Sequence, residues 1–154
     1  MSVVIVFARS SVDLFTKEGA YAYILMNKES KEVFSLSSGF KKPVKTMAQS
    51  DCAAAVNALH KLGTMEAAGV ITEIEVVTDS SVVKDLIEVY KFQKHCEDIA
   101  GCWRNTKGKF PLLKKVTVIK SDKNIRAGDN YAFHLQKCKL AADDRLAKIK
   151  EHSK

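Results

Sequence analysis

The stretch VVTDSSVV, residues 76–83, marks the passage from a buried strand into a helix. Residues 71–78 are mostly apolar and β-branched, which predicts a strand inside a sheet. Ser80 or Ser81 follows directly and can accept hydrogen bonds from the first N–H groups of a helix. That helix is expected to bury Val83, Leu86, Ile87 and Tyr90, and residues 91–101 are predicted to continue as a further helix.

Upstream of this passage, the sequence predicts three strands followed by one helix. The strands fall at residues 3–8, 20–26 and 31–36, with a loop at 10–19 and a hairpin-like connection between the last two. The helix starts at Thr46, because apolar residues then recur with a period of about 3.6 residues, and Gly63 ends it.

Downstream, the sequence predicts a loop, a strand and a long helix. Residues 104–110 form a basic loop, broken by Gly108 and followed by Pro111, and residues 116–120 form the fifth strand. Asp129 or Asn130 can cap the last helix. Its expected core residues are Ala132, Leu135, Cys138, Ala142, Leu146 and Ile149.

The order of these elements, β-β-β-α-β-α-α-β-α, predicts an α/β fold with a five-stranded mixed sheet flanked by helices. The first three strands are expected to form an antiparallel meander, which the last two join in parallel through helical crossovers. No repeat or linker interrupts the order, so we expect a single domain spanning residues 1–154. Ligands of such sheets collect where strand ends and helix starts converge.

The composition is that of a globular protein, with 46% hydrophobic and 28% charged residues among 154. No leader precedes the first strand and no apolar run has the length of a membrane span, so we expect a cytoplasmic protein without membrane contact. The four cysteines form no C-x-x-C pair, which favours reduced, metal-free thiols. Zinc binding by His95, Cys96 and Cys102 is the weaker alternative, because no fourth ligand has a usual spacing.

The net charge of +7 is unevenly distributed along the chain. Residues 84–126, the basic face, contain eleven Lys and Arg against five Asp and Glu. This surplus is either a solvated basic surface or an electrostatic footprint for a polyanion, and charge alone does not separate the two.

Five segments of the chain resemble the ribonuclease H family, and together they cover nearly its whole length. They are VFARSS (6–11), AYAYIL (20–25), SDCAAAVNAL (50–59), VVTDSSVV (76–83) and GCWRNTKGKFP (101–111). The resemblance implies the ribonuclease H-like fold. It also implies hydrolysis of the RNA strand of an RNA–DNA hybrid, with two divalent metal ions held by four carboxylates.

Carried over residue by residue, the resemblance implies a degenerate active site. The first-strand aspartate falls on Arg9, the first-helix glutamate on Asp51 and the fourth-strand aspartate on Asp79. The last-helix aspartate falls on Phe133 or His134, and the loop before that helix contains no histidine to match the family's mobile one.

Arg9 places a permanent cation where the metal ions of the family would lie. A guanidinium repels divalent ions and has a geometry suited to carboxylates, so we expect Arg9 to pair with Asp51 and Asp79 as an internal substitute for metal. The alternative is an arginine that points into solvent from the end of a strand. Asp13, Asp122 and Asp129 are considered as relocated ligands, although Asp13 suits a loop and Asp129 a helix cap.

The basic face also contains aromatic residues, which can stack on bases while cations bind phosphates. In the alternative interpretation, Trp103 and Phe110 belong to the core and the lysines only solubilise the surface. The candidate nucleic-acid-binding residues are Lys91, Lys94, Trp103, Arg104, Lys107, Lys109, Phe110 and Lys114.

Three hypotheses follow from these residues. The leading one is a non-catalytic ribonuclease H-like protein that binds an RNA–DNA hybrid or structured RNA through the basic face and needs no cofactor. The second is an active nuclease that holds magnesium or manganese with Asp51, Asp79 and relocated ligands. The third is a module with the same fold that binds a protein partner.

Overall fold

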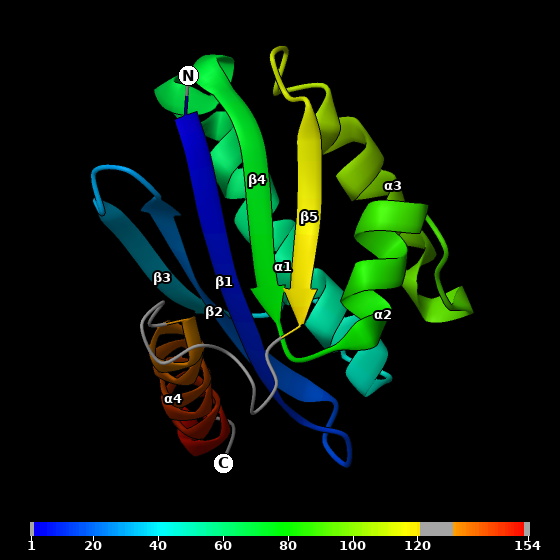
Figure 1. Ribbon diagram of the computed structural model, residues 1–154. Helices are drawn as coiled ribbons and strands as arrows, with labels where there is room; N and C mark the ends of the chain where they lie inside the picture. Colours follow the sequence, from blue (N-terminus) through cyan, green and yellow to red (C-terminus); the bar gives the residue numbers. More distant parts are fainter. Residues whose placement is uncertain (1, 121–130, 153–154) are drawn as a thin grey trace.

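Five strands form one mixed sheet in the order β3-β2-β1-β4-β5 (Figure 1). The computed structural model describes residues 2–120 and 131–152. The strands are β1 (Ser2–Asp13), β2 (Glu18–Asn27), β3 (Val33–Gly39), β4 (Ile71–Thr78) and β5 (Lys115–Lys120). β1, β2 and β3 pair antiparallel, while β4 pairs parallel to β1 and β5 parallel to β4. The predicted mixed sheet, meander included, is confirmed.

Helices cover both faces of the sheet. The helices α1 (Met47–Thr64), α2 (Ser81–Lys84) and α3 (Glu97–Lys107) lie on one face, and α4 (Tyr131–His152) lies on the other (Figure 1). Because successive strand residues point to opposite faces, Val4, Val6 and Ala8 of β1 belong to the core under α1. Ile5 and Phe7 belong to the second core, under α4.

The first hairpin is longer than predicted. Residues 10–13, expected in a loop, extend β1, because each of them pairs with a residue of β2, from Ser10 with Tyr21 to Asp13 with Glu18. Only Leu14–Lys17 remain as the turn. Arg9 therefore lies inside a strand rather than at its end. The third strand is shifted in the same way, to Val33–Gly39 instead of 31–36.

The first helix matches its prediction closely. Thr46 is its N-cap, and the Thr46 hydroxyl accepts a hydrogen bond of 3.0 Å from the Gln49 N–H. The helix continues one residue past Gly63, and a 3₁₀ turn, η1 (Glu66–Val70), leads into β4.

The continuous helix predicted for residues 91–101 is wrong. After α2 comes a π-helical turn, η2 (Asp85–Val89), and Tyr90 then leaves the helix with a left-handed φ of 60°. A short 3₁₀ turn, η3 (Lys94–Cys96), precedes α3. The predicted loop at 104–110 is wrong as well, because its first four residues complete α3.

The last helix buries Leu135, Cys138, Ala142 and Leu146, as predicted, whereas Ala132 is exposed. The two predicted caps, Asp129 and Asn130, lie outside the described residues. None of the helices in residues 2–120 and 131–152 is both long and apolar enough to cross a membrane.

The two edges of the sheet differ. At the β5 edge, the Glu88 carboxylate accepts a hydrogen bond of 2.6 Å from the Val118 N–H, so a side chain protects this edge. β3 forms the other edge and leaves three apolar side chains exposed: Val33, Phe34 and Leu36.

Candidate site at the carboxyl ends of the strands

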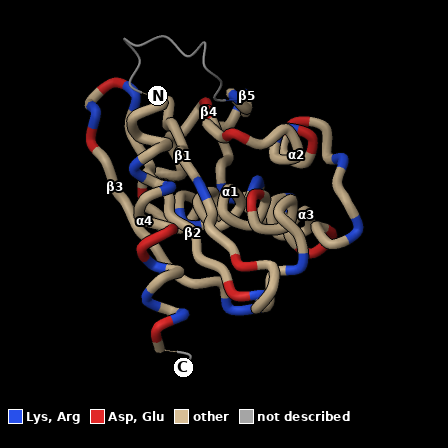
Figure 2. The backbone as a smooth tube through the Cα atoms, turned by 90° about the horizontal axis from the view of Figure 1, so that it is seen from below, with Lys and Arg blue, Asp and Glu red and all other residues tan. Residues whose placement is uncertain are grey.

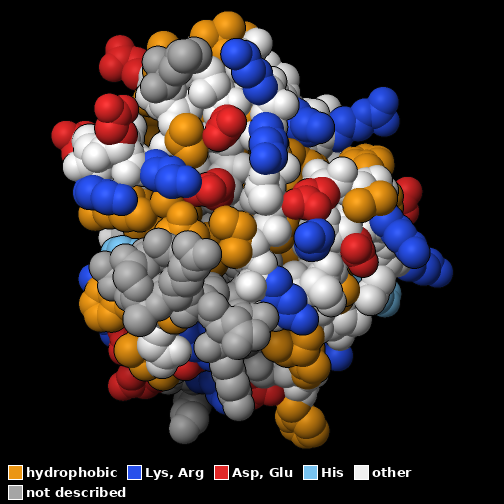
Figure 3. All heavy atoms as spheres, viewed as in Figure 1, with side chains coloured by type: hydrophobic (Ala, Val, Ile, Leu, Met, Phe, Trp, Pro, Cys, Tyr) orange, Lys and Arg blue, Asp and Glu red, His pale blue; other side chains and the backbone are white. Residues whose placement is uncertain are grey.

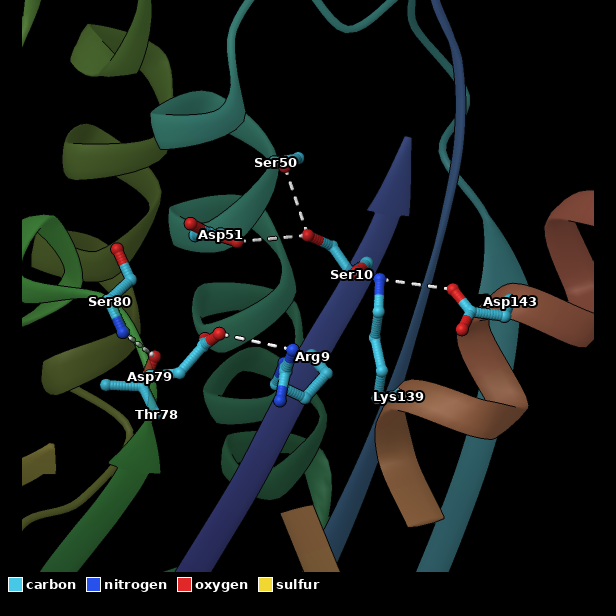
Figure 4. Close-up of polar contacts among 9 residues, drawn as sticks. All are labelled: Arg9, Ser10, Ser50, Asp51, Thr78, Asp79, Ser80, Lys139 and Asp143. Carbon is cyan, nitrogen blue, oxygen red and sulfur yellow. Dashed lines mark hydrogen bonds and ion pairs between the residues drawn. The ribbon is translucent and has the colours of Figure 1, made fainter. Parts of the chain in front are cut away.

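Arg9, Asp51 and Asp79 meet where β1 and β4 approach the start of α1 (Figure 4). β1 and β4 run parallel, so the ends of both strands lie at the same edge of the sheet. Asp79 directly follows β4, and Asp51 lies in the first turns of α1. We call this region the strand-end edge. The family resemblance brought together these same three positions.

An ion pair joins Arg9 to Asp79, with 3.1 Å between Nη2 and Oδ2. The side chain of Arg9 is 21% exposed and that of Asp79 is 42% exposed, so water reaches the pair but does not surround it. The alternative of an arginine free in solvent does not describe this geometry. The expected second partner is different, because within the described chain no ion pair links Arg9 to Asp51.

Asp51 is held by hydroxyl groups instead. The Ser10 hydroxyl lies 3.1 Å from the Asp51 carboxylate and 3.0 Å from the Ser50 hydroxyl. Strand alternation explains the difference, because Ser10 points toward α1 whereas Arg9 points to the face of α4. Burial, followed by the negative charge of Asp79, raises the pKa of Asp51, and hydrogen bonds from Ser10 and Ser80 and the charge of Arg9 oppose this rise.

The last helix contributes two residues that the sequence did not reveal, Lys139 and Asp143 (Figure 4). The Lys139 ammonium donates to the Ser10 carbonyl at 3.2 Å and pairs with Asp143 at 3.1 Å. Burial on its own would raise the pKa of Asp143, but hydrogen bonds from Ser11 and Lys139 outweigh it and lower the pKa. In the sequence this pair has the i, i+4 spacing of a solvated helix face, so no local signal marks it.

The two residues predicted at the last-helix position take no part in these contacts. Phe133 is 60% exposed, and the Lys137 ammonium lies 5.5 Å from its ring. His134 packs against Phe7, with 5.0 Å between ring centroids, and its Nδ1 is buried without a hydrogen-bond partner in the described structure. Burial, with the charges of Lys137 and Lys31, lowers the pKa of His134.

The carboxylates of the strand-end edge do not fit a pair of divalent cations. Arg9 forms an ion pair with Asp79, and Lys139 forms one with Asp143. A metal ion bound to either carboxylate would therefore lie beside a positively charged side chain. Among residues 2–120 and 131–152, no three His, Cys, Asp or Glu side chains form a group that could hold a metal.

Of the three carboxylates considered as relocated ligands, the structure describes Asp13 alone, and Asp13 does not reach the site. Asp13 pairs with Lys150 at 2.6 Å and caps the turn after β1, so its carboxylate serves the hairpin. Asp122 and Asp129 fall outside the described residues.

The cysteines do not assemble a zinc site in the described chain. His95 and Cys102 line a cavity beside α1 and β2, whereas Cys96 lines a different one with Cys52. All four thiols are free, and burial raises the pKa of Cys138 to about 12.

Trp103 and Phe110 cannot stack on bases in this structure, which corrects their predicted role. Their exposed fractions are 1% and 3%, and both belong to the core under α1. The indole N–H of Trp103 donates to the Ile87 carbonyl at 3.2 Å, and this hydrogen bond connects α3 with η2. The core alternative is the correct one for both residues.

The predicted basic face is not a single surface. Lys91 lines a cavity with Cys52, the neighbour of Asp51 in the sequence, and it belongs to the connection between α2 and α3, which runs along the outer side of these helices in Figure 2. Lys114 instead bonds to Thr72 at the start of β4, so about seven residues of strand, roughly 23 Å, separate it from Asp79. On the face seen in Figure 3, acidic and basic side chains intermingle.

A second group of lysines, which the sequence did not reveal, lies beside the turn of the β1–β2 hairpin. The Val44 N–H donates to the Lys17 carbonyl at 2.9 Å, and the Phe40 N–H donates to the Gly19 carbonyl at 3.0 Å. This docking requires glycine at 19, because a Cβ there would lie 2.9 Å from the Phe40 ring. We call the exposed cations that result the hairpin lysines: Lys17, Lys41, Lys42 and Lys45.

None of the hairpin lysines forms an ion pair within the described residues. Because no acidic side chain of the described chain pairs with these four cations, their charge is available to an anionic ligand. Lys41 and Lys42 line a cavity with Ser50, and Lys91 lines another with Cys52, so cations lie near both sequence neighbours of Asp51.

Solved structures with ribonuclease H domains share this fold. The N-terminal RNase H domain of a Mycobacterium tuberculosis protein aligns over 100% of both chains, with a TM-score of 0.69 and 11% identity. RNase H1 of Halobacterium salinarum covers 95% of this chain and 98% of its own, with a TM-score of 0.64 and 12% identity. LC11-RNase H1, solved with an RNA/DNA hybrid, aligns with a TM-score of 0.71 and 13% identity. The alignment covers 95% of this chain and 98% of LC11-RNase H1.

No protein-family model matches the sequence, and the search of curated proteins found no match. At these identities the structural likeness establishes the ribonuclease H-like fold, in agreement with the resemblance seen in the sequence.

Proposed function

We propose that this protein binds nucleic acid at the strand-end edge and does not cleave it. The observation that carries the proposal is the 3.1 Å ion pair between Arg9 and Asp79. Cleavage with two metal ions depends on carboxylates that are free to bind them. A guanidinium fixed on one of these carboxylates opposes metal binding and leaves an edge that a phosphate backbone can approach.

Binding is supported by the cations near this edge. Lys41 and Lys42 of the hairpin lysines share a cavity with Ser50, and Lys91 shares a cavity with Cys52, so both cavities adjoin Asp51. LC11-RNase H1 was solved with an RNA/DNA hybrid and a foamy viral protease-reverse transcriptase with double-stranded DNA, and both share the fold. We propose an RNA–DNA hybrid or structured RNA as the ligand of this chain. A cytoplasmic location, in keeping with its four free thiols, is part of the proposal.

The first test is a cleavage assay on an end-labelled RNA–DNA hybrid with magnesium and, separately, with manganese. The wild-type protein is expected to give no more product than Asp79→Asn, because neither protein holds the metal pair. Cleavage that is present in the wild type and lost in Asp79→Asn would refute the non-catalytic proposal and favour the nuclease.

The second test measures affinity for the same hybrid as a function of salt. Each phosphate contact should contribute about −0.9 to the slope of log K against log salt, because it releases condensed counterions. Replacing Lys41 and Lys42 with alanine should flatten the slope by about two units if both bind phosphate.

Lys107 and Lys109 provide a control with the same loss of charge. They follow the end of α3, and Lys109 packs against Gly63 near the end of α1, away from Asp51. If replacing Lys107 and Lys109 flattened the slope instead, the binding surface would be the one that the sequence predicts around these residues, with Arg104 and Lys114.

A protein partner is a second candidate, favoured by the β3 edge. Val33 is 59% exposed and lies on an edge strand, and such strands can pair with an added strand. Affinity for nucleic acid that is weak at low salt and insensitive to both lysine pairs would leave this candidate as the better one.

A further inference from the structure

The turn between β1 and β2 holds a phenylalanine almost entirely in solvent. Phe15 is 97% exposed, and its neighbour Leu14 is 41% exposed. Figure 1 places this turn at the lower end of the molecule, where Figure 3 shows a projecting hydrophobic group. Single exposed apolar residues are common, so exposure alone does not mark a binding site.

The turn is nevertheless ordered by its own contacts. The Asp13 carboxylate accepts hydrogen bonds from the N–H groups of Phe15 (2.9 Å) and Thr16 (3.2 Å), and the Lys17 N–H donates to the Asp13 carbonyl at 2.8 Å. A hydrogen bond from Lys150 of α4 holds the other carboxylate oxygen and lowers the pKa of Asp13. The backbone under Phe15 is therefore organised before any ligand binds, which reduces the entropy lost on binding.

The cations beside the turn indicate the chemistry of the ligand. Lys17 belongs to the turn, and Lys41 and Lys42 lie in the segment that docks beside this turn. Among the described residues these lysines form no ion pair, and the carboxylate under the ring, Asp13, is paired with Lys150. An exposed aromatic ring next to such lysines suits single-stranded nucleic acid, where bases stack on the ring and cations bind the phosphates. An apolar protein pocket would gain nothing from these lysines.

We propose that Phe15 stacks on an unpaired base while the hairpin lysines bind the adjoining phosphates. Inside a duplex each base face is covered by its neighbour, so a ring at the tip of a hairpin reaches the face of an unpaired base only in a loop or an overhang. The protein then prefers a hybrid that continues into a single strand over a blunt hybrid. This inference rests on the proposed nucleic-acid binding and names the part of the ligand that the tip recognises.

The test compares two RNA–DNA hybrids of equal duplex length, one blunt and one with a five-nucleotide single-stranded overhang. The wild type should bind the overhang hybrid more tightly, and Phe15→Ala should weaken that binding about tenfold, which corresponds to about 1.4 kcal/mol. Binding of the blunt hybrid should not change. Phe133→Ala is the matched control, because Phe133 is also exposed beside a lysine, Lys137, but lies on α4.

A second variant reports on stacking directly. Phe15→Trp places an exposed indole at the tip, while the natural Trp103 is buried and serves as an internal reference. The overhang hybrid should quench the emission of the new tryptophan, and the blunt hybrid should not.

Each outcome separates the inference from the function on which it rests. Wild-type binding of both hybrids with no effect of Phe15→Ala and no quenching would refute the stacking role and leave the proposed function intact. An equal loss on both hybrids would also refute it, because the tip would then contact the duplex. Failure of the wild type to bind either hybrid would refute the proposed function together with the inference.

Discussion

The ion pair between Arg9 and Asp79 provides a quantitative test of how the strand-end edge is stabilised. We consider Arg9→Ala, Asp79→Asn and the double variant, which together form a double-mutant cycle. At the 3.1 Å separation of the charged atoms, the attraction is about 1.3 kcal/mol in the dielectric of water and larger at the partly buried edge. Measured couplings of exposed pairs reach only about 0.2–1 kcal/mol. With side chains 21% and 42% exposed, we expect about 1 kcal/mol of coupling.

Arg9→Ala should also change how stability depends on pH, because Arg9 opposes the rise in the pKa of Asp51. A carboxyl group whose pKa is raised in the folded state contributes stability below its unfolded pKa, about 3.9, and loses it as pH rises through the folded value. Without Arg9 this loss is greater. The cost of Arg9→Ala should therefore be larger at pH 7 than at pH 3.5.

Urea unfolding followed by circular dichroism at the two pH values measures both quantities. A cost that is equal at pH 3.5 and pH 7 would mean that Arg9 stabilises the fold through the packing of its aliphatic stem. A coupling of zero in the cycle would mean that the ion pair does not contribute in solution. Either result would refute the electrostatic account of Arg9.

Three further predictions concern stability and use the same urea assay. Asp51→Asn should raise the free energy of unfolding by up to about 1 kcal/mol at pH 7 and leave it unchanged at pH 3.5, because it removes a carboxylate whose pKa is raised by burial and by Asp79. Glu88→Ala should cost about 1.5–3 kcal/mol, since it removes the acceptor of the Val118 N–H, whereas Glu88→Gln should retain most of the stability. Trp103→Ala should cost about 3–5 kcal/mol, because it empties a buried site and leaves the Ile87 carbonyl without its donor.

The fold could be predicted because its signals are local. The strand predicted at residues 71–78 has those bounds in the structure, and β5 begins one residue earlier than predicted. The break at Tyr90 could not be predicted, because the apolar spacing continues to favour a helix through it. At the break the N–H groups of Tyr90 and Lys91 both donate to the Asp85 carbonyl, with Tyr90 in a left-handed conformation that its residue type does not signal.

Only part of the candidate site, the residues on or next to β1 and β4, could be predicted from the sequence. Arg9 and Asp79 were found through the family resemblance, which assigns them to two strands that the structure pairs in parallel. Whether Lys139 and Asp143 reach β1 depends on the rotation of α4 about its own axis. The sequence indicates that rotation only through the apolar residues of the helix. The hairpin lysines depend on the docking of residues 40–44 against Gly19, a contact between segments that are separate in the sequence.

The charge at the strand-end edge connects the two parts of the proposed function, the absence of cleavage and the binding of nucleic acid. Without metal ions, the four carboxylates implied by the family resemblance would repel a phosphate backbone. Here Arg9 and Lys139 stand among Asp51, Asp79 and Asp143, which leaves one net negative charge, and the raised pKa of Asp51 favours its neutral form. The substitution at position 9 thus removes a ligand that metal-dependent cleavage needs and, in the same step, removes much of the repulsion that metal ions would otherwise offset. An edge neutralised in this way can accept a polyanion at any metal concentration, with the nearby lysines supplying the attraction.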